Sequence, residues 1–171
     1  MIGANIAPGM NREFQAQKWL KLLSEKQWAN AFDEARSLVK DVPEMHINGY
    51  DLDPEIVKCA AQNARAAGVD KYIHFQAKDV KNLSSPKSYG FVVTNPPYGE
   101  RLEEKEALPA LYTTIGKSFA NLDKWSMYLI TSYEDTEQYI GRKADKNRKI
   151  YNGMIKAYFY QFMGPRPPKK N

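Results

Sequence analysis

Helical and strand-like patterns alternate through the middle of this chain, and this alternation limits the fold more than any other feature of the sequence. Apolar runs typical of short strands lie at residues 45–51, 72–77, 91–94 and 127–131. Helical patterns lie between them, at residues 53–68 and 109–120. Strands that alternate with helices form a mostly parallel sheet with helices packed on its faces. We therefore expect an α/β fold.

Residues 11–40 have a helical pattern throughout, because large apolar side chains recur there every three or four residues. The repeat is interrupted near Ser24, so two helices are expected. Closer to the C-terminus, a weaker helical pattern at residues 134–143 contains Gly141, which disfavours a helix.

An antiparallel hairpin is expected after that segment. Two strand-like runs, 148–151 and 154–163, are joined by Asn152-Gly153, a dipeptide that favours tight hairpin turns because both residues tolerate positive φ. The sheet is thus expected to be mostly parallel and to end in an antiparallel hairpin. The remaining residues, 164–171, are basic and rich in proline, and we expect them to form a disordered tail.

The length and composition indicate one globular domain, since the chain has 171 residues of which 43% are hydrophobic. Its formal net charge of +5 permits a polyanionic partner such as nucleic acid. The single cysteine, Cys59, cannot form an internal disulfide, and no apolar run is long enough to span a membrane. Because Met1 begins no signal-peptide pattern, we expect a cytoplasmic protein.

The motif Asn95-Pro96-Pro97-Tyr98 follows the apolar run 91–93, so a buried strand is expected to end in a rigid polar corner. The two prolines fix φ and remove two backbone N–H donors, which leaves mainly acceptors. The side-chain oxygen of Asn95 and the carbonyl of Pro96 could both accept from one NH₂ group, with the Tyr98 ring as a flat face beside them. Such a corner suits the exocyclic amine of a nucleobase.

An exocyclic amine is a poor nucleophile because its lone pair is delocalised into the ring. Two acceptors on its hydrogens would localise that pair toward an electrophile, and SN2 methyl transfer requires little more than this alignment. The alternative is that the motif forms only a tight turn, since Asn-Pro and Pro-Pro pairs are common in turns. Its position after a buried strand, where open α/β sheets bind ligands, favours the active-site interpretation.

Acidic residues follow two of the expected strands, at the sheet edge where α/β folds bind ligands. A carboxylate there can accept hydrogen bonds from both hydroxyl groups of a ribose, and we assign this role to Asp51. Asp79 could accept from the amino group of an adenine while the backbone N–H of Val80 donates to its ring. Solvation in a loop or a helix cap is the alternative for both acids. Asp53 is instead expected to cap a helix that begins at Pro54.

These motifs resemble those of class I S-adenosylmethionine-dependent methyltransferases that act on amino groups. Asn95-Pro96-Pro97-Tyr98 is similar to motif IV, while residues 49–54 and Asp79 stand in the order and spacing of motifs II and III. The chain also resembles, more specifically, the catalytic domain of bacterial ribosomal RNA large-subunit guanine-N2 methyltransferases, often labelled N6-adenine-specific DNA methylases. The residues that carry this resemblance are 5–14, 95–101 and 151–153.

The resemblance implies a Rossmann-like class I methyltransferase sheet, S-adenosyl-L-methionine as cofactor and RNA, chiefly ribosomal RNA, as partner. Asn95 and Pro96 would hold the target amine, with Pro97 in the same catalytic motif. Tyr98 would stack on a base turned out of its helix. Arg101 would contact a phosphate, the alternative being an ordinary surface arginine. The adenosine part of the cofactor would be held by Asp51, Leu52, Asp79 and Val80.

The glycine-rich motif I of that family is absent, and no Gly-x-Gly occurs in the sequence. Residues 1–9 resemble the segment that follows the first helix of the family's fold. We therefore expect residues 1–163 to form a partial catalytic domain that lacks the first strand, the glycine loop and a THUMP domain that normally precedes them. In the class I sheet, that first strand lies between the strands that end at Asp51 and Thr94.

Other functions remain open. A non-catalytic RNA-binding remnant would use the basic surface and Tyr98, and would bind RNA in a salt-dependent way without the cofactor. A Rossmann-type oxidoreductase would also place acids at strand ends, but the missing Gly-x-Gly-x-x-Gly disfavours it. His46 and His74 are isolated, so no metal site is expected. Guanine N2 and adenine N6, in RNA or DNA, present an NH₂ group to the same acceptors, so both targets remain open.

Because motif I is missing, we predict weak or no binding of S-adenosylmethionine by this chain alone. S-adenosylhomocysteine is the ligand to titrate. Calorimetric titration measures this binding, with Asp51→Ala as the comparison and circular dichroism to confirm that both proteins are folded. Micromolar affinity that Asp51→Ala abolishes would contradict the prediction and would establish the cofactor site.

Overall fold

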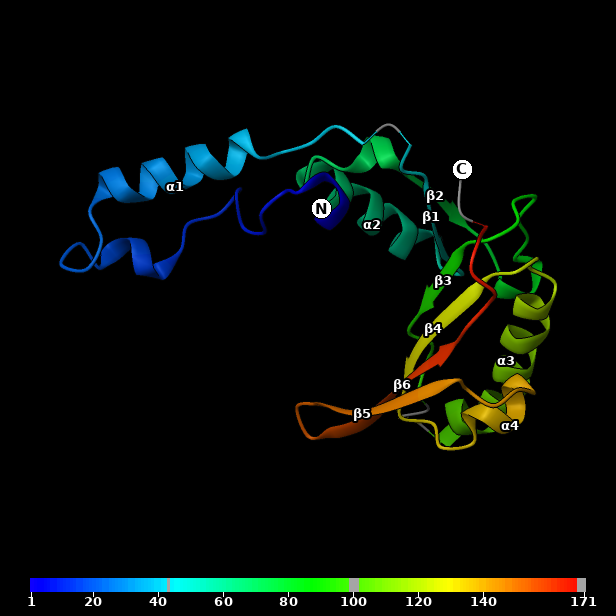
Figure 1. The fold of residues 1–171 in the computed structure, drawn as a ribbon. Coiled ribbons are helices and arrows are strands. Elements are labelled where there is room, and N and C mark those ends of the chain that lie inside the picture. Colours follow the sequence, from blue (N-terminus) through cyan, green and yellow to red (C-terminus); the bar gives the residue numbers. More distant parts are fainter. Residues whose placement is uncertain (43, 99–101, 169–171) are drawn as a thin grey trace. The chain divides into compact units, whose positions relative to one another are not determined.

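The computed structural model describes residues 1–42, 44–98 and 102–168, and the chain divides into two compact units (Figure 1). The N-terminal unit is Met1–Lys78 and the C-terminal unit is Asp79–Asn171. In the described residues, the first unit has a sheet of two strands and the second a sheet of four. No helix in this part of the chain combines the length and the apolar character that crossing a membrane requires.

The N-terminal unit contains a βαβ arrangement. Strands β1 (Ile47–Asp51) and β2 (Ile73–Ala77) pair in parallel, and helix α2 (Pro54–Ala66) connects them. Parallel strands require such a crossover because the chain must return to the same end of the sheet. Helix α2 begins as predicted, because the Asp53 carboxylate accepts a hydrogen bond from the Glu55 N–H at 2.8 Å and caps the helix.

The core of this unit is small and forms around Ala64 of α2. Ala64 packs with Val69 and with Tyr72, the last residue of the 3₁₀ helix η3 (Asp70–Tyr72) that leads into β2. Ile56 is another apolar residue of α2, but its side chain is 53% exposed. Ile56 lies in the first turn of α2, two turns before Ala64, which makes the contact with the core.

Of the two helices expected over residues 11–40, the structure has one, α1 (Glu25–Ser37). It begins after the predicted break with a capping box: the Ser24 hydroxyl accepts from the Gln27 N–H at 3.3 Å, and Gln27 Oε1 accepts from the Ser24 N–H at 2.8 Å. No residue of α1 is buried, but Trp28 stacks on Phe14 with the ring centres 6.1 Å apart, so the helix packs against the segment before it. The preceding residues form only short 3₁₀ helices, η1 (Ile2–Ala4) and η2 (Gln15–Lys18).

The C-terminal unit is built on a mixed sheet in the order β3-β4-β6-β5. Strands β3 and β4 are parallel, whereas β6 is antiparallel to both β4 and β5. With the parallel pair β1 and β2, this arrangement confirms the predicted α/β class and its C-terminal antiparallel hairpin. The strands are β3 (Phe91–Thr94), β4 (Ser126–Thr131), β5 (Lys146–Asn152) and β6 (Ile155–Phe162). The helices are η4 (Val80–Asn82), α3 (Leu102–Ala120) and α4 (Thr136–Ile140).

Helix α3 is longer than predicted, because it begins at Leu102 and not at Pro109. A proline inside a helix lacks the N–H that would bond to the carbonyl four residues earlier, here that of Lys105. Burial of the surrounding apolar side chains offsets this loss. The buried residues of α3 nearest to Pro109 are Leu108, Tyr112 and Ile115.

The β5–β6 hairpin turns one residue later than predicted. Asn152 still pairs with Ile155 in the ladder, so the two turn residues are Gly153 and Met154. Gly153 has a φ of +60°, a conformation that glycine adopts without a steric cost. The need for positive φ at the first turn position explains the shift from the predicted Asn152-Gly153 turn.

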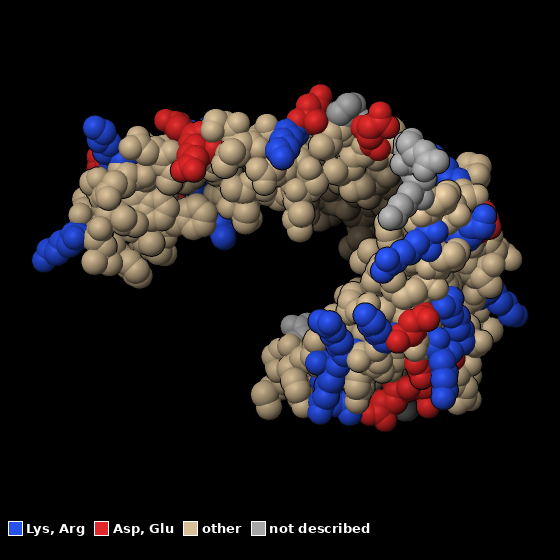
Figure 2. Space-filling model, viewed as in Figure 1, with Lys and Arg blue, Asp and Glu red and all other residues tan. Residues whose placement is uncertain are grey.

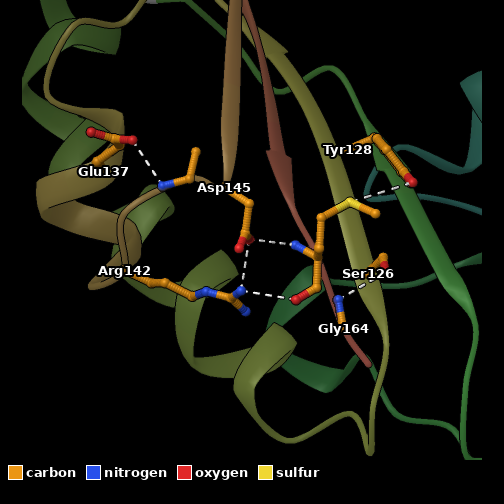
Figure 3. A network of polar contacts seen from close by, with 8 residues as sticks. Ser126, Tyr128, Glu137, Arg142, Asp145 and Gly164 are labelled. Carbon is orange, nitrogen blue, oxygen red and sulfur yellow. Dashed lines mark hydrogen bonds and ion pairs between the residues drawn. The ribbon is translucent and has the colours of Figure 1, made fainter. Parts of the chain in front are cut away.

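A network of polar contacts fixes the open end of this hairpin (Figure 3). The Asp145 carboxylate precedes β5 and accepts from the Met163 N–H, just beyond β6, at 2.8 Å. Arg142 Nη2 donates both to Asp145 Oδ2 and to the Met163 carbonyl, each at 2.8 Å. The hydrogen bond from the Met163 N–H is the main reason why the pKa of Asp145 lies below its usual value. The two strands are therefore joined at this end by side chains as well as by the ladder.

Helices α3 and α4 are in close contact at Gly116. Helix α4 is shorter than the predicted 134–143, because Gly141 adopts a φ of +78° and ends it. A Cβ atom added at Gly116 would lie 2.3 Å from the backbone oxygen of Ile140, the last residue of α4. No side chain fits at this distance, so glycine permits the contact.

We predict that Gly116→Ala destabilises the chain by about 1–3 kcal/mol, because the new methyl group overlaps the Ile140 carbonyl. The sign is informative, since Gly→Ala in an ordinary helix interior stabilises by roughly 0.5–1 kcal/mol. Urea unfolding followed by circular dichroism measures the difference, with Lys117→Ala at an exposed neighbouring position as the control. A Gly116→Ala chain as stable as the wild type would show that α4 can move away without cost.

Candidate active site

Two strand ends of the C-terminal unit define the candidate site. Strands β3 and β4 are parallel, so their carboxyl ends lie at the same edge of the sheet. Thr94, the last residue of β3, pairs with Leu129, so β4 extends further, to Thr131. The corner that begins at Asn95 and the loop 132–135 therefore leave the sheet at one edge.

The corner after β3 consists of the four residues of the predicted motif. Pro96 is buried, Asn95 and Pro97 are exposed, and Tyr98 is half-buried. The Tyr98 hydroxyl donates a hydrogen bond to Asn95 Oδ1. An amide oxygen has two lone pairs, so this atom can accept a second hydrogen bond from a target amine. Tyr98 thus orients the Asn95 side chain, a role that the sequence did not suggest.

A pocket of about 520 Å³ adjoins the corner. Its walls come from the corner, α3, the loop after β4 and the start of β6, namely Tyr98, Lys105, Leu108, Ser132, Tyr133, Glu134, Asp135 and Ile155. Small-molecule sites in proteins typically have volumes of about 300–1,000 Å³. The combination of aromatic walls with carboxylate, ammonium and hydroxyl groups suits a flat ring with polar edges.

A chain of hydrogen bonds joins the loop after β4 to the corner. Tyr112 of α3 is fully buried, and its hydroxyl lies 3.3 Å from the Pro97 carbonyl and 2.5 Å from Thr131 Oγ1. The Tyr133 N–H donates to Thr131 Oγ1 at 3.0 Å. Because each hydroxyl has one proton, Tyr112 donates to Pro97 and Thr131 donates to Tyr112. The corner and the loop after β4 are therefore joined through the core.

Burial keeps the hydroxyls of this region protonated. It raises the pKa of Tyr112 to about 12. Burial is also the main cause that raises the pKa of Tyr133, with a smaller contribution from Tyr139. These tyrosines act as hydrogen-bond groups at neutral pH and not as bases. The charged groups of the pocket wall are Lys105, Glu134 and Asp135.

Asp51 and Leu52, two of the predicted cofactor residues, lie at the end of β1 in the N-terminal unit. Asp51 is exposed, and its Oδ1 accepts from the Asp53 N–H at 2.9 Å. Leu52 is 73% exposed. Asp51 is thus the last residue of a parallel strand, and one oxygen of its carboxylate bonds within the turn. A carboxylate in this position suits a ligand that donates from hydroxyl groups.

Asp79 and Val80 lie at the start of the C-terminal unit. Asp79 Oδ1 accepts from the Lys81 N–H at 2.9 Å and caps η4, the role that was the alternative to cofactor binding. That bond is the main cause that lowers the pKa of Asp79, with a further contribution from the Lys81 ammonium at 3.1 Å. Asp79 is therefore ionised at neutral pH and can still accept from a ligand. Val80 packs against the core.

The structure brings the four residues of the Asn95-Pro96-Pro97-Tyr98 motif together beside one pocket. Arg101 lies outside the described residues. A second pocket, of about 720 Å³, lies in the N-terminal unit between residues 10–13 and α1, and no predicted site residue lines it. The cofactor roles predicted for the acids and their neighbours stay predictions.

Sequence reasoning missed Tyr112 and Thr131, which join the corner to the core, and every residue of the pocket wall except Tyr98. The rule that ligands bind beyond strand ends was applied to the strands before Asp51 and Asp79. Applied to the strand that ends at Thr131, it would have identified the loop 132–135. No local signal marks Tyr112, because it reaches the corner from the middle of a helix.

Residues 1–161 match the protein family described as UPF0020, RMKL-like, methyltransferase domain. The chain belongs to this family. Its membership confirms the resemblance inferred from the Asn95-Pro96-Pro97-Tyr98 motif and its neighbours. The methyltransferase fold predicted from that resemblance is confirmed as well, since the crystal structure of SMU.472 in complex with SAH matches with a TM-score of 0.90. That match has 39% identity and covers 98% of this chain and 44% of SMU.472.

Curated relatives of this RMKL-like domain are similar along nearly its whole length. YpsC of Bacillus subtilis, named provisionally as an RNA methyltransferase, is 40% identical over 171 residues, which are 99% of this chain and 44% of YpsC. The ribosomal RNA large subunit methyltransferase K/L of Shewanella amazonensis is 35% identical over 164 residues, 93% of this chain and 23% of that protein. The chain thus spans less than half the length of the curated relatives it matches.

We predict that Tyr112→Phe lowers the free energy of unfolding by about 1–3 kcal/mol, because the Pro97 carbonyl and the Thr131 hydroxyl each lose a buried partner. It should also change the response to alkali. The folded-state pKa of Tyr112, about 12, lies above the reference value of 10.0. The contribution of the neutral Tyr112 hydroxyl to the free energy of unfolding is therefore complete below pH 10.0 and is lost as the pH rises toward 12.

Urea unfolding at a series of alkaline pH values checks this prediction. The wild type should lose stability more steeply than Tyr112→Phe over this range, because the unfolded chain releases the proton first. Tyr151→Phe, at an exposed position, is the control and should follow the wild type. Equal slopes for wild type and Tyr112→Phe would contradict the assignment of a buried neutral hydroxyl.

Proposed function

We propose that this chain is the catalytic part of an enzyme that methylates an exocyclic amine of an RNA base with S-adenosyl-L-methionine. The proposed target is guanine N2 in large-subunit ribosomal RNA. The observation that carries the proposal is the Asn95-Pro96-Pro97-Tyr98 corner, which follows a parallel strand and adjoins a pocket of about 520 Å³. Membership of the RMKL-like methyltransferase family and the names of the relatives support it.

The corner would act on the target amine through two acceptors. S-adenosylmethionine supplies an electrophilic methyl group. Asn95 Oδ1, which the Tyr98 hydroxyl already orients, and the Pro96 carbonyl accept from the two amine hydrogens. The nitrogen lone pair would then point away from the corner. The nitrogen would bond to the methyl carbon as the bond from that carbon to the cofactor's sulfur breaks, so that S-adenosylhomocysteine leaves, and one amine proton would pass to solvent. Alignment supplies most of what such a displacement requires.

Asp51 and Asp79 are the carboxylates that we propose to hold the cofactor's adenosine. Asp51 Oδ1 accepts from the Asp53 N–H, and among the described residues no group donates to Oδ2, so Oδ2 is available to the ribose hydroxyls. Asp79 is ionised and can accept from the adenine amino group. Leu52 and Val80 would supply apolar contacts to the base. The SAH bound in SMU.472 supports this choice of cofactor.

The carboxylates of the pocket wall favour guanine over adenine. Glu134 and Asp135 line the pocket that Tyr98 adjoins. The N1–H of guanine stands next to the N2 amine and can donate to a carboxylate. The N1 atom of adenine stands next to the N6 amine and is an acceptor, which a carboxylate repels. The name of the Shewanella amazonensis relative agrees with a ribosomal RNA target.

We further propose that the whole protein has an RNA-binding THUMP domain N-terminal to this segment and acts in the cytoplasm. This chain spans 44% of YpsC and 23% of the K/L methyltransferase, so both relatives have room for such a domain. A separate RNA-binding domain would deliver the target to the pocket of the C-terminal unit.

Methyl transfer to ribosomal RNA by the protein in its natural full length tests the proposed function. The product nucleosides are identified by mass spectrometry, and we expect N2-methylguanosine. Asn95→Ala should lower the transfer rate at least about 100-fold, because misplacing a reacting group costs that much. Detection of N6-methyladenosine in its place would show that the target is adenine and not guanine. RNA binding with no transfer would favour the non-catalytic alternative.

Variants of Tyr98 serve as matched controls for the corner. Tyr98→Phe keeps the ring but loses the hydrogen bond to Asn95. It should lower the transfer rate with little change in RNA affinity. Tyr98→Ala should weaken RNA affinity as well, since stacking on a base is worth about 1–3 kcal/mol. Asn121→Ala, at an exposed position after α3, should leave both quantities unchanged.

A further inference from the structure

The β5–β6 hairpin extends beyond the rest of its sheet (Figure 1). The last pair between β4 and β6 joins Thr131 to Tyr158, whereas β5 and β6 continue to pair as far as Asn152 and Ile155. The free end projects at the edge where the pocket opens, because Thr131 ends β4 and Ile155 lines the pocket. An RNA strand that enters the pocket would pass beside this end.

Lysines and tyrosines alternate on one face of the free end. Lys149 pairs with Tyr158, and Tyr151 pairs with Lys156. Paired residues share a face of the sheet, as do residues two apart in one strand. The Lys149 ammonium lies 5.3 Å from the centre of the Tyr151 ring, and the Lys156 ammonium lies 5.3 Å from the centre of the Tyr158 ring. We name these four residues the Lys-Tyr patch.

The free end is exposed although several of its side chains are apolar. Tyr151 is 66% exposed and Met154 in the turn is 99% exposed. The Lys156 ammonium lies 3.2 Å from the carboxylate of Glu134, which is part of the pocket wall, so the patch is continuous with the pocket. Basic residues on an edge strand also prevent aggregation, but an exposed tyrosine and methionine beside them do not serve that purpose.

The hairpin is suited to hold a ligand because its other end is fixed. The contacts among Arg142, Asp145 and Met163 join the two strands there (Figure 3). In the view of Figure 2, Lys and Arg side chains gather over the hairpin. Among the described residues, no carboxylate forms an ion pair with Lys149 or Arg148. Their charge is therefore available to an anionic partner.

We propose that the Lys-Tyr patch binds the single-stranded RNA that flanks the target base, an inference that rests on the proposed function. A single strand presents a phosphate and a flat base in every nucleotide. Cations that bind phosphates and rings that stack on bases are the two features that single-strand sites combine. The patch combines these features, with Lys149 placed for a phosphate and the exposed ring of Tyr151 placed for a base. Lys156 is held beside the pocket wall by its ion pair with Glu134.

Anisotropy titrations of a fluorescent single-stranded RNA with the full chain, at several salt concentrations, test the patch. Tyr151→Ala should weaken binding about tenfold, the loss expected when one stacked base is released. Lys149→Gln should lower affinity and reduce the slope of log K against log salt by about 0.7, the value for one phosphate contact. Lys146→Gln is the matched control, because Lys146 is on the same strand but pairs with Gln161 on the opposite face.

Unchanged affinity in Tyr151→Ala and Lys149→Gln, with circular dichroism spectra like that of the wild type, would overturn the proposal. An equal loss in Lys146→Gln would also overturn it, because the effect would then reflect general charge. So would a duplex RNA that competes as well as the single strand. The methyl-transfer assay separates this inference from the proposed function. If the wild type transfers methyl groups but the patch variants bind RNA as tightly as it does, only the patch proposal is rejected. If RNA binding depends on the patch but no methyl transfer occurs, the proposed function is rejected.

Discussion

The candidate site depends on the two ladders of hydrogen bonds along β4, which is paired with β3 in parallel and with β6 in antiparallel orientation. Its side chains at Met127, Leu129 and Thr131 are fully buried. Buried backbone groups must remain paired, and a slip of one residue would turn these side chains to the opposite face. The corner after β3, the loop after β4 and the start of β6 are therefore held in register by one strand.

Local chemistry was enough to predict the parts of the fold that neighbouring residues decide. Asp53 caps its helix as expected, α1 begins at the predicted break near Ser24, and the strand at residues 91–94 has the predicted bounds. The prediction that this strand is buried is wrong, because Phe91 and Val93 are 70% and 79% exposed. The local rules failed where distant contacts outweigh them. Pro109 does not begin α3, because burial of the residues around it stabilises a longer helix. The shift of the hairpin turn by one residue has a local cause instead, because Gly153 adopts the positive φ that the first turn position requires.

The candidate site divides in the same way. Its corner could be predicted because Asn95, Tyr98 and the prolines between them are consecutive. The hydrogen bonds that join this corner to the core could not, because Tyr112 and Thr131 come from separate elements that only packing brings together. The structure also shows a hydrogen bond that was not predicted from the sequence, from the Tyr98 hydroxyl to Asn95 Oδ1. The aromatic ring and the amide of the motif thus form one unit before any ligand arrives.

The connections within the C-terminal sheet differ greatly in length. Strands β5 and β6 are joined by a turn of two residues, Gly153 and Met154, whereas β3 reaches β4 only after the whole of α3. Closing a short loop costs less chain entropy, and a hairpin forms within roughly 1–10 μs. We therefore expect the hairpin to fold early and the β3–β4 pairing to follow. During folding, the surface proposed to hold RNA would then exist before the corner that acts on it.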